Sequence, residues 1–264
     1  MDNGSQDGMV EAMNKECATL TVPYHITLLT ENIGFAGGHN RLFRETNSEY
    51  ILLLNQDMYL RPDCLEKLVE FSDNHANVAA VAPRLMKWDF GKVENLEESF
   101  SSKIDALGLK VFRNRRVVEQ YTGEEWPLSF RLTGTILSVF GVSGAFPMYR
   151  RSALTDVAFN DETFFDELYH SYKEDIDLAY RLVSAGYESY VLLDTVAYHD
   201  RAGAGPREMD DASAVINKKN QSDWVKYHSY KNHLMTLYKN EYWQNFLLDF
   251  FQIVWYELKK FEWF

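Results

Sequence analysis

The chain has 264 residues, of which 46% are hydrophobic and 15% aromatic, and its formal net charge is −12. So many apolar side chains exclude a largely disordered chain, and the negative charge argues against nucleic acid as a partner. The two cysteines, Cys17 and Cys64, lack the spacing of a metal site, and neither a secretory signal nor a membrane-spanning run is evident. We therefore expect one cytoplasmic domain with room for an appendage.

Strands and helices alternate through the first third of the chain. The patterns predict, in order, a helix to about Cys17, a strand over 25–30, a glycine-rich turn opening a helix to about Thr46, a strand over 50–55, a helix from Pro62 to about Phe71, and a strand over 78–83. The runs YILLLN and VAAVAP are continuously apolar, which is typical of strands buried on both faces of a sheet. The alternation predicts an α/β fold whose Rossmann-like, mostly parallel sheet is flanked by helices.

Residues 88–135 interrupt this alternation with charges, glycines and short β-like pieces, and we interpret them as an inserted flap. The later patterns predict a strand over 144–150, a short helix, an acidic helix from Glu174 to Ala185, and strands over 187–192 and 195–199. After a linker, RAGAGPREMD, residues 222–264 have a helical pattern. We therefore expect a main domain over 1–203 and a C-terminal helical region over 204–264.

Asp57 and His199 each follow an apolar strand, so both should emerge at an edge of the sheet. An oxygen ligand at such an edge suits Mg²⁺ or Mn²⁺, which complete their coordination with phosphate and water. Asp57 could equally be a turn residue before the helix at Pro62. By itself, His199 is weak evidence for a metal site. It becomes stronger evidence only if Asp57 lies close to it in space.

Glu174 and Asp175 open the acidic helix, whose buried side should carry Ile176, Ala179, Leu182 and Val183. Acids in a first turn are stabilised by the helix dipole, by about 0.3–1 kcal/mol, which explains many such pairs. A carboxylate held at a helix start and facing a crevice can also act as a general base toward a hydroxyl group. Asp177 points elsewhere, and we expect it to serve structure or solvent.

Two further segments leave alternatives open. In ENIGFAGGHN, the glycines Gly34, Gly37 and Gly38 would let the backbone approach a phosphate, although the spacing is not that of the dinucleotide fingerprint. The aromatic stretch over 242–264 is too short and polar to span a bilayer. It could pack on the domain or lie on a membrane surface.

Taken together, these segments resemble the family two glycosyltransferases of bacteria, in particular the rhamnosyltransferase-like branch. The resemblance runs from Asp2 to about Asn240, and its motifs follow in the family's order: DNGSQDG, ENIGFAGGHN, LLLNQD, IDALGL, VSGAFPMYRRSAL, FDELYHSYKEDIDLAYRLVSAGY, AYHDR and YHSYKNHLMTLYKN. One of these motifs alone would be weak evidence, whereas the ordered series is specific.

The resemblance implies a GT-A type fold, Mg²⁺ or Mn²⁺, a dTDP-, UDP- or GDP-sugar donor, and inverting transfer to a glycan or lipid-linked acceptor. It places such an enzyme in the cytoplasm, with peripheral contact to the inner face of the cell membrane through 242–264. Carried over by position, it implies nine site residues: the general base Asp175 with Glu174 beside it, the metal ligand Asp57 with His199 as a further contact, and the donor-binding residues Asp2, Asn32, Gly34, Asn40 and Asn55.

Two departures from the family pattern matter. Gln56 replaces the usual proline between Asn55 and Asp57, and the family's first strand, helix and second strand have no counterpart before Met1. We therefore expect an incomplete domain that catalyses little by itself. The alternative function is a non-catalytic fragment that binds a sugar nucleotide or glycan. A nucleotidyltransferase ranks third, because it would need a basic glycine-rich loop near its first strand.

Overall fold

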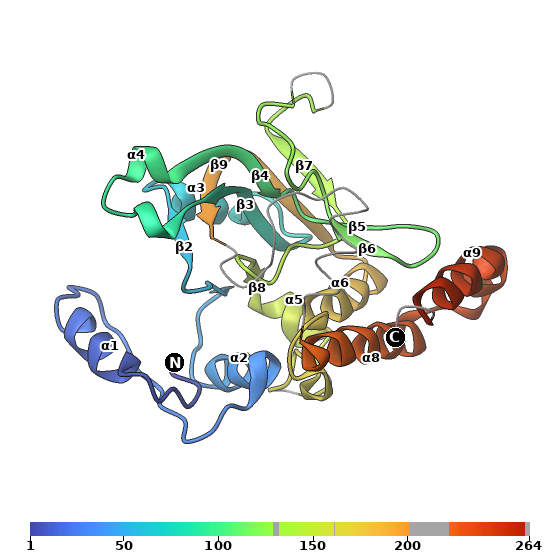
Figure 1. Cartoon of the computed structure of the whole chain (residues 1–264), viewed down its shortest axis with the longest axis horizontal. Coiled ribbons are helices and arrows are strands. Elements are labelled where there is room, and N and C mark those ends of the chain that lie inside the picture. The colour runs from blue at the N-terminus through green and yellow to red at the C-terminus, as the bar shows by residue number, and fades with distance from the viewer. Residues whose placement is uncertain (129–131, 161, 201–221, 262–264) are drawn as a thin grey trace.

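The computed structural model describes residues 1–128, 132–160, 162–200 and 222–261 of the chain. It confirms an α/β fold, in which helices flank a central sheet (Figure 1). Within the described ranges this sheet has seven strands in the order β1-β8-β3-β9-β2, with β4 added beside β3 and β7 beside β9. A separate two-stranded sheet pairs β5 with β6.

The strands of the main sheet are β1 (Tyr50–Leu52), β2 (Met58–Leu60), β3 (Val78–Trp88), β4 (Phe100–Ala106), β7 (Ile136–Val139), β8 (Met148–Arg150) and β9 (Glu188–His199). The small sheet consists of β5 (Leu109–Val111) and β6 (Val117–Glu119). The helices are α1 (Met9–Cys17), α2 (Gly34–Arg44), α3 (Cys64–Asp73), α4 (Leu96–Ser99), α5 (Arg151–Asp156), α6 (Glu174–Ser184), α8 (Asp223–Asn240) and α9 (Trp243–Phe261), with 3-10 turns η1 (Phe90–Lys92) and η2 (Glu167–Tyr169).

The centre of the sheet is the long pair β3 and β9, which run parallel and are buried over most of their length. Their continuous apolar runs agree with the pattern expected of strands covered on both faces. The other ladders of the main sheet, however, are antiparallel. The expectation of a mostly parallel sheet is therefore corrected to a mixed sheet, because a buried apolar run does not encode the direction of its neighbour.

Several expected elements have different bounds. Residues 25–30 form a single bridge, between Leu28 and Asp2, and Leu28 is 51% exposed, so this segment has too little cover to become a strand. The strand expected over 50–55 ends at Leu52 and is half-buried, since β1 lies at the edge of the sheet. The two strands expected over 187–199 are one continuous strand, β9.

The expected flap over 88–135 is partly built into the main sheet. Its strand β4 pairs with β3, with irregular register near Met86. Only β5 and β6 form a separate sheet. Of the expected buried face of α6, Val183 is instead 46% exposed, whereas Ile176, Ala179 and Leu182 are buried.

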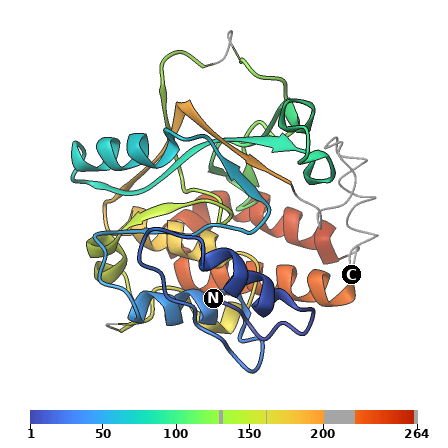
Figure 2. The same cartoon turned by 90° about the vertical axis from the view of Figure 1, so that its left-hand side faces the viewer.

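The C-terminal region consists of two helices, and the linker expected over 201–210 lies outside the described residues. Figures 1 and 2 both place α8 beside α6, the helix that begins with the acidic pair. Across the described ranges, no helix combines the length and apolar character needed to cross a membrane.

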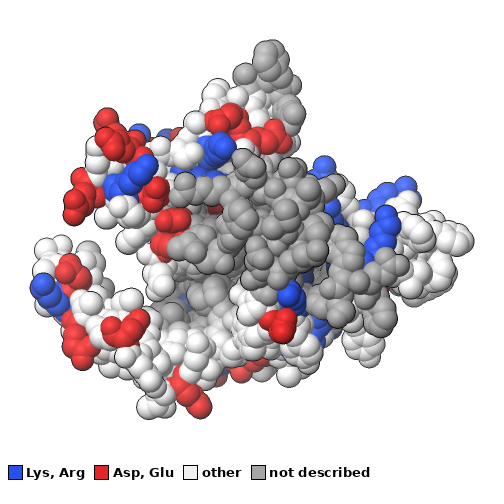
Figure 3. Space-filling model, viewed as in Figure 1, with Lys and Arg blue, Asp and Glu red and all other residues white. Residues whose placement is uncertain are grey.

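Charged residues are unevenly spread over the face in Figure 3. Asp and Glu gather at the left, over α1 and α4, whereas the charged residues visible beside α9 at the right are Lys and Arg. The same face is hollowed at the left, between α1 below and the α4 and β2 region above. The hollow thus lies beside the strand that directly follows Asp57.

Candidate active site

The acidic pair lies at the N-terminal end of α6, as the sequence predicts. Lys173, the residue before the helix, has a left-handed backbone (φ 68°), which turns the chain sharply into the first helical turn. Glu174 is buried, whereas Asp175 is half-buried. One Asp175 oxygen accepts the backbone N–H of Gly144 at 3.0 Å and the other accepts that of Ile176 at 2.8 Å. These amides fix the direction of the carboxylate.

The two carboxyl groups compete for a proton. Burial, and then the charge of Asp175, raise the pKa of Glu174 to about 8. Burial also raises the pKa of Asp175, but the amides of Gly144 and Ile176 oppose that rise by stabilising the ionised form. We therefore assign the shared proton to Glu174 and the negative charge to Asp175 near neutral pH. A carboxylate in this state can accept a proton from a hydroxyl group.

A second acidic cluster forms where β2 and β9 pair, because Met58 lies opposite His199 in their register. His199 Nε2 and Asp57 Oδ1 are 3.4 Å apart, and His199 Nδ1 hydrogen-bonds to Asp105 Oδ2 at 2.9 Å. If the Nδ1–H donates to Asp105, the lone pair of Nε2 faces Asp57. His199 and Asp105 are buried, and the Asp57 side chain is 29% exposed. The condition set for His199, proximity to Asp57, is met.

Asp105 is a member of this cluster that was not predicted from the sequence. It lies in IDALGL on β4, inside the segment interpreted as a flap, and only the pairing of β4 with β3 brings it to β9. The sequence signal that could have identified Asp105 was the resemblance of the IDALGL segment to the family.

A short stretch of backbone connects the two acidic clusters. Asn55, two residues before Asp57, donates its backbone N–H to the carbonyl of Ala145 at 3.1 Å. The neighbouring residue, Gly144, donates its own N–H to Asp175. The loop after β1 and the start of α6 are thus held against the same two residues before β8.

At the expected donor site, hydrogen bonds connect the first residues of the chain to the segment that leads into α2. Asp2 is buried and accepts the backbone N–H groups of Gly4 and Ser5, and hydrogen bonding by Ser5 holds the pKa of Asp2 below its usual value. The side chain of Asn3, which the sequence analysis missed, bonds to Asn32, to the Ile33 amide and to the Gly34 carbonyl.

Asn40 has a different surrounding from the one expected. Its side chain has no exposed surface and makes four hydrogen bonds, to backbone groups of Phe164 and Phe165 and to the Glu167 carboxylate. It therefore fastens α2 to residues 164–167 and has no accessible atom with which to contact a donor in this structure.

The turn that leads into α6 is strained. His170, Tyr172 and Lys173 all have φ between 61° and 75°. Each such residue costs about 1–3 kcal/mol. Gly34 at the start of α2 allows the turn to approach closely, since a Cβ there would lie 2.4 Å from the His170 ring and 2.5 Å from its carbonyl oxygen.

The Asp57 cluster suits a divalent ion that takes most of its ligands from a substrate. Within the described ranges, no group of three or more His, Cys, Asp and Glu side chains is arranged to hold a metal alone. A carboxylate and an imidazole in contact, with Asp105 orienting the ring, fit Mg²⁺ or Mn²⁺ when diphosphate and water complete the shell.

A pocket of about 460 Å³ lies elsewhere, at the C-terminal end of α6 against the junction of α8 and α9. It is lined by Val157, Arg181, Ser184, Ala185, Lys239, Asn240, Glu241 and Tyr242. Because it is at the opposite end of α6 from Glu174, it is separate from the acidic site.

Several known proteins are similar to this chain. A Bacillus subtilis protein described as an uncharacterized glycosyltransferase, YfnE, is 23% identical over 81% of this chain, and the chain spans 59% of that protein's length. The structure of GalNAc-T7 with UDP, GalNAc and Mn²⁺ matches 88% of this chain and 39% of its own, with a TM-score of 0.60 and 8% identity. The structure of S. aureus TarS 1–349 with UDP-GlcNAc matches 89% of this chain and 61% of its own, with a TM-score of 0.49 and 18% identity. The family model "Glycosyl transferase family 2" matches residues 1–157, more than half of the chain. The chain therefore belongs to glycosyl transferase family 2.

Proposed function

We propose that the protein transfers a sugar from a nucleotide-sugar donor to a hydroxyl group with inversion at the anomeric carbon. The observation that carries this proposal is the shared backbone support of the two acidic clusters, in which Gly144 holds Asp175 and Ala145 holds the loop of Asp57. A base for the acceptor and a charged site for a diphosphate are both needed for such a transfer.

In the proposed reaction, Asp175 accepts the proton of the attacking hydroxyl group. The new glycosidic bond forms on one face of the anomeric carbon while the bond to the diphosphate breaks on the other. Glu174, which keeps its proton, can donate a hydrogen bond to acceptor or donor. The amide hydrogen bonds to Asp175 hold its carboxylate ready for this step, so little reorganisation is needed.

A bound Mg²⁺ or Mn²⁺ would supply positive charge that stabilises the departing diphosphate. Asp57 and His199 would hold it, and Asp105 would orient the imidazole. The presence of UDP and Mn²⁺ in the GalNAc-T7 structure, which shares the fold, supports a nucleotide-sugar donor and a divalent ion here.

For the donor, we propose that Asp2 contacts the base and that Asn32, Gly34 and Asn55 line the path to the diphosphate. Asn40 would act indirectly, through residues 164–167. Three finer points belong to the same proposal. The donor carries dTDP, UDP or GDP, and its specificity is rhamnosyltransferase-like. The reaction serves the synthesis of cell-surface polysaccharide or glycolipid.

We further propose a peripheral membrane contact through α9 at the cytoplasmic face, where a lipid-linked acceptor would be presented. This helix exposes an unusual set of large apolar side chains: Trp243, Leu247, Leu248, Phe251, Trp255 and Leu258, each at least 58% exposed. Its last turn carries Lys259 and Lys260. Aromatic and basic residues of this kind suit the interface of a bilayer.

The membrane proposal is tested with Phe251→Ser and Trp255→Ser, because each removes about 1.5–3 kcal/mol of apolar transfer free energy. Co-sedimentation with vesicles containing anionic lipid should fall at least tenfold. The matched control is Tyr238→Ser on α8, which removes a side chain that is 92% exposed. Equal binding by all three variants would reject α9 as the contact.

The decisive test of the enzymatic function is Asp175→Asn. Loss of the base should lower kcat by about 10²–10⁴-fold, while the Kd for the donor, measured by calorimetry, stays within about threefold. The anomeric configuration of the product, read by NMR, tests inversion. A non-catalytic binder would lose nothing measurable in the variant, and it would show no turnover before the change.

The donor base is found by thermal melts with UDP, dTDP and GDP, each with and without Mn²⁺. One nucleotide should raise the Tm strongly, and only together with the metal. A Tm that responds to none of the three, in a protein with a cooperative transition, would contradict a nucleotide-sugar donor.

A further inference from the structure

The helix α8 contacts the strained turn before the acidic pair through several side chains, among them Thr236 at the Tyr169 hydroxyl, and Asn232 is the one that bonds to the backbone of the turn at three points. Asn232 has no exposed surface, and its Nδ2 donates to the carbonyls of Tyr169, Ser171 and Tyr172 at 2.9, 2.9 and 2.7 Å. Three carbonyl acceptors require the amide nitrogen on this side. The two hydrogens of one amide group are thus shared among three backbone carbonyls of the turn.

The placement of the Asn232 side chain leaves its amide oxygen in an unfavourable environment. Among the described residues, Asn232 Oδ1 is buried without a hydrogen-bond partner. A buried carbonyl without a partner destabilises the folded state. Stability alone therefore gives a weak reason for an asparagine here, whereas holding the turn gives a direct one.

The turn held by Asn232 also contacts the other side of the site. The carbonyl of His170 accepts the backbone N–H of Ala36 at 3.2 Å, and Ser171 Oγ accepts that of Phe35 at 3.4 Å. Both donors lie in the first turn of α2, next to Gly34. One short segment thus touches the proposed donor side and leads directly into Glu174 and Asp175.

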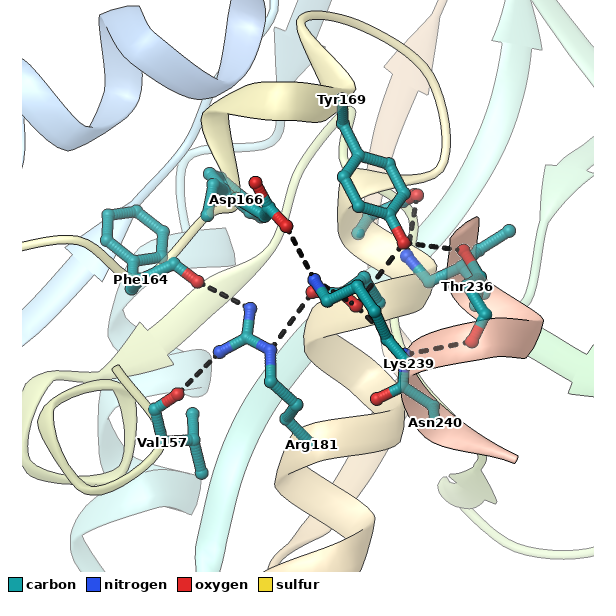
Figure 4. A network of polar contacts seen from close by, with 12 residues as sticks. Val157, Phe164, Asp166, Tyr169, Arg181, Thr236, Lys239 and Asn240 are labelled. Carbon is teal, nitrogen blue, oxygen red and sulfur yellow. Dashed lines mark hydrogen bonds and ion pairs between the residues drawn. The ribbon is translucent and has the colours of Figure 1, made fainter. Parts of the chain in front are cut away.

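A second set of contacts fixes α8 to α6 further along the helix. In Figure 4 the side chains of Lys239 and Asn240 point from α8 toward Arg181 and Tyr169, and both bond to Asp177 at 2.9 Å. Lys239 also pairs with Asp166 at 2.7 Å, at the start of the segment that contains the turn. These contacts set the distance between the helices, so that Asn232 meets the turn in a fixed register.

We propose that Asn232 is a positioning residue, which holds the turn over 169–172 so that Asp175 and the start of α2 keep their relative placement. The C-terminal helices would then be part of the active site and not an appendage. This inference rests on the proposed function, since it presumes that Asp175 acts on the acceptor. It predicts an effect on kcat from a residue that contacts neither substrate.

The test compares Asn232→Ala and Asn232→Asp with His233→Ala in the full chain. His233 is the next residue on α8 and also buried, but its Nε2 pairs with Glu257 of α9 at 2.7 Å. Asn232→Asp keeps the shape and removes the donors, which separates hydrogen bonding from packing. Both Asn232 variants should lower kcat about 10–100-fold, because a displacement near 1 Å has this effect, and the donor Kd should change less than threefold.

His233→Ala should lower the Tm while leaving kcat within about twofold. Hydrogen exchange followed by mass spectrometry provides a readout that needs no turnover: peptides covering 166–178 and 33–38 should lose protection in the Asn232 variants and keep it in His233→Ala. Unchanged exchange in those peptides, or the same loss of kcat in all three variants, would overturn the inference. If the unmodified protein transfers no sugar, the proposed function fails, and exchange still decides whether Asn232 holds the turn.

Discussion

Glu174 and Asp177 lie three residues apart on α6, both buried, yet their surroundings are opposite. At Asp177, burial opposes ionisation, but Arg181, Asn240 and Lys239 outweigh it and hold the pKa below its usual value. At Glu174, burial and the neighbouring Asp175 raise the pKa to about 8. One Glu174 oxygen is buried without a hydrogen-bond partner among the described residues.

This difference distinguishes an acid with structural contacts from the acidic pair that we propose to act in catalysis. The contacts of Asp177 are complete: its oxygens bond to Arg181, Lys239, Asn240 and Tyr169. The acidic pair instead destabilises its own charged forms, which a fold tolerates where the chemistry needs it. The expectation that Asp177 serves structure agrees with its contacts, and the comparison gives three ways to test the distinction.

The largest effect is expected from breaking the structural contact. Asp177→Asn should lower the free energy of unfolding by about 3 kcal/mol, because Arg181 would lose the carboxylate that compensates its charge and Lys239 would lose one of its two carboxylate partners. Denaturant unfolding measures the change. Asp63→Asn is the control, since its ion pair with Lys67 is exposed and contributes little to stability. A loss no larger than that of the control would contradict a structural role for Asp177.

The next effect concerns the pH dependence of stability. Because the folded-state pKa of Glu174, about 8, is above its value in the unfolded chain, the folded protein keeps a proton that the unfolded chain releases between about pH 4.5 and 8. Stability should therefore fall as the pH rises through this window. Glu174→Gln removes the group, so its stability relative to the unmodified protein should rise by about 2–4 kcal/mol from pH 5 to pH 9.

The measurement is a series of urea unfolding curves across that pH range. Glu66→Gln on α3 is the matched control, an exchange of the same side chain at an exposed position. If the two variants show the same pH dependence, Glu174 does not hold a proton in the folded state.

Local patterns in the sequence were enough for the longer helices, but not for the four-residue α4 inside the expected flap. The helical periodicity around Ile176 and Leu182 placed α6, and the apolar run from Val78 placed β3. The direction of strand pairing could not be read, because an apolar run such as YILLLN packs equally well beside a parallel or an antiparallel neighbour. The segment around Leu28 had the pattern of a strand but not the neighbours that would cover it.

The missed residues share one property: their partners are distant in sequence. Asp105 reaches His199 only through the sheet, and Asn232 reaches Tyr169 only through the packing of α8 on α6. Asn40 was expected to line the donor path because it follows the glycines of α2, but its position on that helix directs its amide to Phe165. The position of Asn40 beside the glycines indicated where the residue lies in the fold, but not the direction in which its side chain points.

Asp105 shares features with both kinds of acid. It is buried and paired like Asp177, yet its partner, His199, faces the proposed metal. Asp105→Asn should lower the affinity for nucleotide with Mn²⁺ about 10–100-fold, since a carboxylate that orients a metal-binding histidine contributes this much. Without the metal, in the presence of a chelator, the affinity should be weak and the same in both proteins. Calorimetry measures both, using the nucleoside diphosphate that raises the Tm most. The control is Asp194→Asn, which lies on β9 like His199 but is exposed and paired with Lys67. An equal loss with and without Mn²⁺ would mean that Asp105 supports the fold of the sheet and not the metal, and it would then belong with Asp177.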